Sequence, residues 1–105
     1  MKIAIPTWQG RISPVFDVAS HVLIVEVMDG EEKNRAEVTL STEDPLERAK
    51  SLAILDVEIL ICSRVSKTLE MALAPQRIKV FQNISGKVEE VLAAYIDGNL
   101  NRFRR

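Results

Sequence analysis

The sequence has very few of the side chains that usually bind metals or act as nucleophiles. Its 105 residues include one cysteine, Cys62, and one histidine, His21. A single cysteine excludes a disulfide within the chain and favours a reducing compartment, so we expect a cytoplasmic protein. The formal net charge of −1 provides no basic field that would hold nucleic acid, so nucleic-acid binding is not expected.

Long hydrophobic runs are also missing. The apolar run at the start of the chain is too short for the core of a signal peptide, and no later stretch has the ~20 apolar residues that cross a bilayer. We therefore expect no membrane association. The 47% hydrophobic and 28% charged residues are typical of a globular protein, and we expect residues 1–105 to form one domain. A core of this size is modest, which favours a homo-oligomer.

Five segments have the pattern of β-strands. Residues 21–28 are apolar on both faces, whereas residues 35–40 alternate between apolar and polar side chains, as a half-exposed edge strand does. The turn signal Asp29-Gly30 lies between these two segments and favours an antiparallel hairpin. Three further short apolar runs are typical of buried strands: residues 2–7, 57–61 and 77–81.

Three segments have the apolar spacing of helices. At the first, Asp44 is the expected N-cap, Pro45 occupies the first helical position, and Glu47 is placed to close a capping box. The second helix is expected from about Ser66 to Pro75. The third follows residues 85–86 and ends at Gly98, which is suited to a C-terminal cap.

The order of these elements, βββ followed by αβαβα, predicts a mixed α/β fold. The alternating second half requires parallel strands joined by crossover helices. The first strand is then central, with the hairpin on one side and the two later strands on the other. We therefore predict a three-layer α/β/α architecture of the ribonuclease-H-like type, with a five-stranded mixed sheet in the order 3-2-1-4-5.

This topology predicts a ligand site at the carboxyl ends of the parallel strands, where ligands of open α/β sheets collect. Three loops would meet there, residues 7–19, 62–66 and 82–86. The N-termini of the last two helices would face the same edge and favour an anion. The serines on these loops are alternatively helix caps. The candidate ligand-binding residues are Arg11, Ser13, Phe16, Cys62, Ser63, Ser85 and Gly86.

Cys62 and His21 are the candidate metal ligands. Cys62 ends a parallel strand at the predicted edge, where Arg64 and a helix N-terminus would lower the pKa of its thiol. The alternative is that Cys62 is a small buried hydrophobic residue. One cysteine does not hold an iron–sulfur cluster alone, since such clusters take about four ligands. His21 begins a strand near the same edge, with Asp17 as a further oxygen ligand; the alternative for His21 is a partly exposed strand end.

The loop Gly10-Arg11-Ile12-Ser13-Pro14-Val15-Phe16 follows an initial Met-Lys-Ile-Ala-Ile-Pro and resembles the dinitrogenase iron–molybdenum cofactor biosynthesis family. The resemblance extends through residues 21–30, 58–64 and 85–98. It implies a ribonuclease-H-like fold and a non-catalytic carrier that binds iron–molybdenum cofactor, or an iron–sulfur cluster precursor, during metallocluster assembly. Cofactor-binding members carry a histidine after the loop proline, where this chain has Val15, and some have a cysteine at the position of Ser85.

The resemblance and the residues together are compatible with two functions. One is the metallocluster carrier, which would act with protein partners in cluster assembly. The other is a metal-free regulatory or scaffold module that binds a small anionic ligand or a protein partner, and the missing loop histidine favours it. Nuclease activity is not expected, because the first strand has no carboxylate to hold metal ions. Arg102, Arg104 and Arg105 form a basic tail that predicts a solvated, frayed terminus; the alternative is contact with nucleic acid or an acidic partner.

Overall fold

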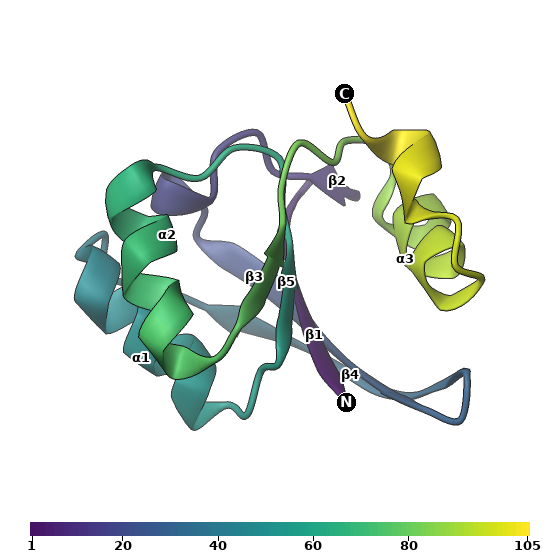
Figure 1. The fold of residues 1–105 in the computed structure, drawn as a ribbon, viewed down its shortest axis with the longest axis horizontal. Helices are drawn as coiled ribbons and strands as arrows, with labels where there is room; N and C mark the ends of the chain where they lie inside the picture. The colour runs from purple at the N-terminus through teal and green to yellow at the C-terminus, as the bar shows by residue number, and fades with distance from the viewer.

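A mixed β-sheet forms the middle layer of the computed structural model, which describes residues 1–105 (Figure 1). The sheet order is β4-β3-β1-β5-β6, with β1 at the centre, and this is the predicted order. β1 pairs antiparallel with β3 and parallel with β5. The five strands are β1 (Lys2–Trp8), β3 (His21–Met28), β4 (Glu31–Thr39), β5 (Ile59–Ile61) and β6 (Lys79–Phe81).

A sixth strand, β2 (Arg11–Ile12), pairs antiparallel with the end of β1, so the prediction of five strands was wrong. Gln9 and Gly10 make the connection, and both have positive φ, 52° and 77°. Two left-handed residues are what a two-residue hairpin turn requires. β2 was missed because it is only two residues long and lies in a segment rich in turn-forming residues. The ribonuclease-H-like assignment remains a prediction.

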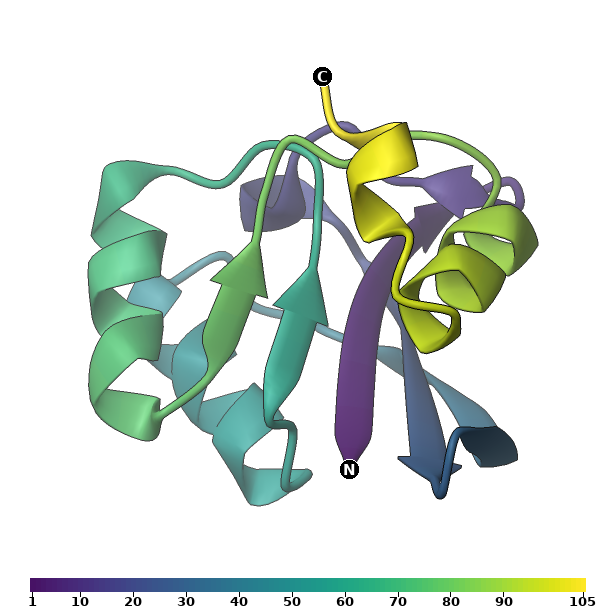
Figure 2. The ribbon, with the colours of Figure 1, turned by 45° about the vertical axis from the view of Figure 1, so that its right-hand side comes forward.

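Helices cover both faces of the sheet, which gives the predicted three layers (Figures 1 and 2). Helices α1 (Pro45–Ile54) and α2 (Lys67–Leu73) pack on one face, and α3 (Val88–Ile96) with the 3-10 helix η3 (Leu100–Phe103) packs on the other. Because side chains alternate along a strand, β1 sends Ala4 into the first core and Ile3 and Ile5 into the second. None of the helices has both the length and the apolar character needed to cross a bilayer.

The helix termini agree with the sequence patterns in position but not in every contact. Asp44 is the N-cap of α1 and Pro45 begins the helix, as predicted. The Asp44 side chain makes no capping hydrogen bond, so the expected capping box is absent. Ser66 does cap α2, because its hydroxyl accepts a 3.1 Å hydrogen bond from the Leu69 N–H. At the end of α3, Asp97 is the C-cap, and Gly98 follows with a positive φ of 79°.

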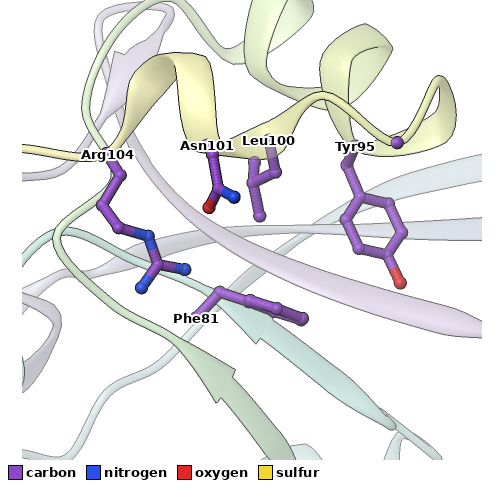
Figure 3. Close-up of a pocket in the computed structure, with 6 residues that line it drawn as sticks. Phe81, Tyr95, Leu100, Asn101 and Arg104 are labelled. Carbon is purple, nitrogen blue, oxygen red and sulfur yellow. The ribbon is translucent and has the colours of Figure 1, made fainter.

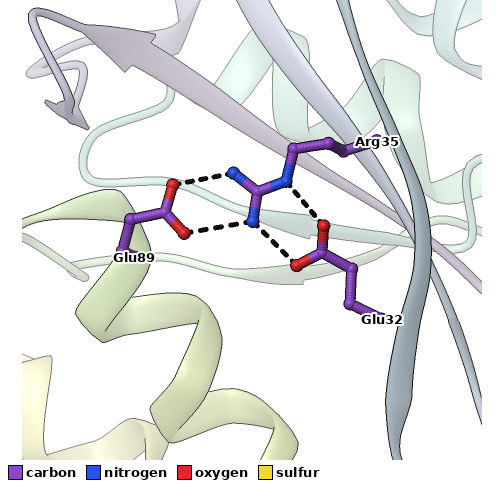
Figure 4. A network of polar contacts seen from close by, with 3 residues as sticks. All are labelled: Glu32, Arg35 and Glu89. Atoms are coloured by element: carbon purple, nitrogen blue, oxygen red, sulfur yellow. Dashed lines mark hydrogen bonds and ion pairs between the residues drawn. The ribbon is translucent and has the colours of Figure 1, made fainter.

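The edge strand β4 is longer than predicted, since it begins at Glu31 rather than at residue 35. It is mostly exposed and rich in charged side chains, which discourages pairing with other sheets. Arg35 ties this strand to α3: its guanidinium hydrogen-bonds Glu32 of its own strand and Glu89 of the helix (Figure 4). The ion pair between Arg35 Nη1 and Glu89 Oε2 measures 2.7 Å.

Candidate functional site

The three loops expected at the carboxyl edge of the parallel strands meet there, at the top of Figure 2. Backbone hydrogen bonds join them directly. The Ile12 N–H donates to the Gly86 carbonyl oxygen at 2.9 Å, which links β2 to the loop after β6. The Asn83 N–H donates to the Ser63 carbonyl oxygen at 2.7 Å, which links the loops after β5 and β6. These contacts hold residues distant in sequence in one rim.

A pocket of about 390 Å³ opens in this rim. Three arginines line it, and each comes from a different segment: Arg11 from β2, Arg64 from the loop after β5, and Arg105 from the end of the chain. The rest of the lining comes from the same loops and is small or apolar: Ile12, Pro14, Val15, Ser63, Ser85 and Gly86.

The three guanidinium groups of the pocket have no acidic side chain beside them. No aspartate or glutamate lines the pocket, and none of the ion pairs in the structure involves Arg11, Arg64 or Arg105. A guanidinium is charged at any ordinary pH and presents several N–H donors in a planar fork. The net charge of the whole chain is −1, yet three arginines lie together at this rim. Such a cluster of guanidinium groups is suited to binding a polyanion.

The helix N-termini contribute less to this site than the sequence suggested. At α2, the Ser66 N–H donates to Asp17 Oδ1 at 2.7 Å, and the Leu69 N–H is bound by Ser66. At α3, the Val88 N–H donates to the Gly10 carbonyl oxygen at 2.9 Å. These donors are already used within the protein, so the arginine side chains are the main source of charge at the pocket.

Cys62 is completely buried and does not line the pocket. Side chains alternate along β5 and its extension, so Leu60 and Cys62 enter the core beneath α1 and α2 while Ile61 enters the other core. Burial raises the pKa of the Cys62 thiol to about 12, and the charges of Asp17 and Glu70 add to this effect. The expected lowering of this pKa was wrong, because the thiol lies in an apolar interior that disfavours the charged thiolate.

Phe16 is also removed from the pocket, because its side chain is fully buried in the same core as Cys62. The guanidinium of Arg48, from α1, lies 5.5 Å from the ring centre, and its Nη1 donates to the Phe16 carbonyl oxygen at 3.0 Å. The Phe16 N–H donates to the Arg64 carbonyl oxygen at 2.8 Å. Phe16 therefore anchors the loop backbone beside the pocket instead of contacting a ligand there.

The structure does not bring His21 and Cys62 together. His21 is exposed at the start of β3, and its Nδ1 lies 3.1 Å from Glu37 Oε1. Asp17 is bound to the N-terminus of α2 and is not paired with His21. No group of three histidine, cysteine, aspartate or glutamate side chains lies close enough to hold a metal ion.

Four of the predicted ligand-binding residues line one pocket, namely Arg11, Ser63, Ser85 and Gly86. Ser13 is buried next to it, where its N–H donates to the Pro6 carbonyl oxygen at 2.9 Å. The sequence reasoning did not find Arg105 as a lining residue, because a basic tail carries no signal of where it docks. It also missed Arg48, although residue 48 is four positions before Leu52 on the apolar side of α1.

By its fold and its rim, the molecule is a three-layer α/β protein with a cationic pocket at the carboxyl edge of its parallel strands. A family model described as "Dinitrogenase iron-molybdenum cofactor" matches residues 1–98. The chain belongs to this family, and the resemblance noted in the sequence is confirmed.

Similar proteins cover nearly the whole chain. MJ0580 of Methanocaldococcus jannaschii is 24% identical over 108 residues, covering 98% of this chain and 92% of that protein. The crystal structure of PH0822 matches with a TM-score of 0.88 at 19% identity, over 93% of this chain and 90% of that one. The apo orange protein of Desulfovibrio gigas has a TM-score of 0.75 at 24% identity, over 93% and 88%. At these identities the structures establish the fold alone.

Proposed function

We propose that this protein is a non-catalytic carrier whose rim pocket binds an anionic metal–sulfur cargo. The cargo class is iron–molybdenum cofactor or an iron–sulfur precursor of it, as the family membership suggests. The observation that carries the proposal is the convergence of Arg11, Arg64 and Arg105 on one pocket without an aspartate or glutamate. Metal–sulfur clusters with bridging sulfides are commonly anionic, and guanidinium groups bind anions by charge and by hydrogen bonds.

The lining indicates how such a cargo would be held. It offers guanidinium and hydroxyl donors but no cysteine, histidine, aspartate or glutamate side chain that would coordinate a metal ion. Val15 lies in the lining at the position where the cofactor-binding members have a histidine. The proposed binding is therefore electrostatic and does not involve a bond between the protein and the metal. A cargo bound in this way leaves readily, which suits delivery to a protein partner.

The same lining argues for a carrier rather than an enzyme. Nucleophilic catalysis by serine requires an adjacent base, and general acid–base catalysis requires a side chain that exchanges protons near neutral pH. Ser63 and Ser85 have no histidine, aspartate or glutamate beside them in the pocket.

The proposal is tested by anaerobic titration with tetrathiomolybdate, a soluble molybdenum–sulfide dianion, and by reconstitution with iron and sulfide. We expect the native protein to bind the preformed dianion. Reconstitution with iron and sulfide should leave no chromophore on the protein, because the lining offers no ligand on which a cluster could be assembled. Arg11→Gln and Arg64→Gln should each weaken binding about ten- to a hundred-fold, since a charge-assisted hydrogen bond contributes about 1.5–3 kcal/mol. Cys62→Ala should bind as well as the native protein, because the thiol is outside the pocket.

Arg77→Gln is the matched control for these variants. Arg77 is exposed and precedes β6, at the opposite end of that strand from the rim, so its loss changes the net charge equally. Equal binding by the native protein and the Arg11→Gln variant would refute the pocket assignment. A brown chromophore that the native protein retains and Cys62→Ala loses would show that a thiolate ligand holds the cargo instead.

The alternative is a metal-free regulatory or scaffold module that binds a small oxyanion or a protein partner. The absence of metal-coordinating groups from the lining favours it. Under this alternative, phosphate or pyrophosphate raises the thermal midpoint in the native protein but not in Arg11→Gln, while tetrathiomolybdate and iron–sulfide do not bind. The proposed homo-oligomer is measured separately, by light scattering in the presence and absence of these anions.

A further inference from the structure

The last seven residues, 99–105, lie beyond the part of the chain that the family model matches. They are nevertheless part of the folded structure, which corrects the expectation of a frayed tail. Asn99 precedes η3, and Leu100 is buried in the core under α3. We call residues 99–105 the C-terminal arm. Its apolar contacts place it beside the rim without any help from a ligand.

The C-terminal arm is joined to the rim loop after β6 by backbone hydrogen bonds. The Ser85 N–H donates to the Phe103 carbonyl oxygen at 3.1 Å, and the Arg105 N–H donates to the Asn83 carbonyl oxygen at 2.7 Å. Two such bonds in an antiparallel arrangement fix the direction in which each successive side chain of the arm points.

A close approach between Phe103 and Gly86 completes the docking. A Cβ atom on Gly86 would lie 3.1 Å from Cδ1 of the Phe103 ring, and Gly86 has a φ of +132° that other residues rarely adopt. The absence of a side chain at Gly86 therefore leaves space for the ring. Phe103 packs against the α3 core from this position.

The docked arm sends two neighbouring arginines to two different pockets. Arg105 lines the cationic rim pocket, and its Nε donates to Ser85 Oγ at 3.0 Å. Arg104 has an extended backbone and faces a second pocket of about 220 Å³ between β6 and η3 (Figure 3). The other residues of that second pocket are Phe81, Tyr95, Gly98, Leu100 and Asn101.

We propose that the C-terminal arm is a specificity element that adds Arg105 to the anion-binding groups of the rim. This inference rests on the proposed function, because it assumes that the rim pocket binds an anion. Arg11 and Arg64 come from the part of the chain that the family model matches, whereas Arg105 does not. The Arg105 guanidinium is a third cationic donor in the pocket and favours anions with two or more negative charges, because Coulomb attraction grows with the charge of the ligand.

The test compares adjacent arginines with opposite orientations, using tetrathiomolybdate and pyrophosphate as probes and monovalent perchlorate as the reference. Arg105→Gln should weaken binding of both multivalent probes about tenfold and weaken perchlorate less. Arg104→Gln removes the same charge one residue away, and it should bind all three anions as the native protein does. Phe103→Ala should reproduce the loss, because the arm then undocks.

The outcomes separate this inference from the proposed function. If Arg11→Gln loses binding while Arg105→Gln does not, the rim pocket stands and the role of the arm is refuted. Equal losses in Arg104→Gln and Arg105→Gln would also refute it, because general charge would then explain both. If the native protein binds none of the probes, both the inference and the proposed function fail. Circular dichroism of each variant checks that the fold is retained.

Discussion

The guanidinium of Arg48 lies over the ring of Phe16 and hydrogen-bonds its carbonyl oxygen, so a buried cation holds the loop that leads to the rim pocket. Arg48 is only 1% exposed, and its Nε has no hydrogen-bond partner. Burial lowers the pKa of Arg48, and the carboxylates of Glu43 and Asp17 partly oppose that shift. The loop position therefore depends on a charge that is costly to bury.

Substitution of Arg48 separates its packing from its hydrogen bond. Arg48→Ala leaves a cavity and an unpaired Phe16 carbonyl oxygen, and we expect it to lower the free energy of unfolding by about 2–4 kcal/mol. Arg48→Met refills the space without the buried charge, so it should lose less than half as much. Urea unfolding measures both. If the methionine variant is as unstable as the alanine variant, the hydrogen bond dominates and the packing argument is wrong.

The buried thiol of Cys62 predicts a specific loss of stability at alkaline pH. The folded pKa of about 12 lies above the usual thiol pKa, so the unfolded chain loses its proton first as the pH rises. The free energy of unfolding therefore has its full value, with respect to this thiol, below about pH 8.5. Above that pH it declines by about 1.4 kcal/mol per pH unit until the pH reaches the folded pKa. Cys62→Ala has no thiol and lacks this decline.

Urea unfolding of the native protein and Cys62→Ala at pH 7.5 and pH 10 measures the effect. We expect the difference in stability between the two proteins to shrink at pH 10. Alkylation by iodoacetamide at pH 8 provides a second readout, and the native thiol should react only after unfolding. Rapid labelling of the folded protein would contradict the burial of this residue.

The ion pairs of Arg35 predict a small contribution that depends on pH and salt. Hydrogen bonds from Arg35 hold the pKa values of Glu32 and Glu89 below the usual range. The resulting stability is present above the unfolded carboxyl pKa and is lost as the pH falls through the lower folded values. Both carboxylates are partly exposed, so Glu89→Gln should cost only about 0.5 kcal/mol at neutral pH and low salt.

Thermal unfolding of Glu89→Gln in 20 mM and 1 M salt tests this assignment. We expect the difference in thermal midpoint from the native protein to disappear at high salt. At 1 M salt the Debye screening length is only about 3 Å, so the attraction within an exposed ion pair is largely screened. Glu90→Gln is the neighbouring control, since Glu90 is exposed and forms no ion pair in the structure. A salt-independent loss in Glu89→Gln would indicate an effect on the helix rather than on the pair.

Gly86 predicts a coupling between the rim and the C-terminal arm. Gly86→Ala places a methyl group against Phe103 in an unfavourable backbone conformation, and strain of this kind costs about 1–3 kcal/mol. In a Phe103→Ala background the steric part disappears, so the same substitution should cost less. The difference, measured by urea unfolding in a double-mutant cycle, reports the contact. Strict additivity would show that the two residues do not interact.

The architecture of this protein follows from patterns within its amino-acid sequence. Alternating and helical apolar spacing identified five strands and three helices, and the crossover rule placed the first strand at the centre of the sheet. Those patterns involve residues close together in the sequence, so they can be recognised without a three-dimensional structure. The rule that ligands of open α/β sheets collect at the carboxyl ends of the strands predicted a pocket at this edge, and a pocket there is lined by Arg11, Ser63, Ser85 and Gly86.

Which side chains face the pocket could not be predicted without the three-dimensional packing. Cys62 and Ser63 are neighbours in the chain, yet one enters the core and the other lines the rim, because adjacent side chains point to opposite sides. Arg105 reaches the pocket through backbone bonds to a loop about twenty residues earlier. Contacts of this kind depend on how distant segments pack, and no local sequence pattern records them.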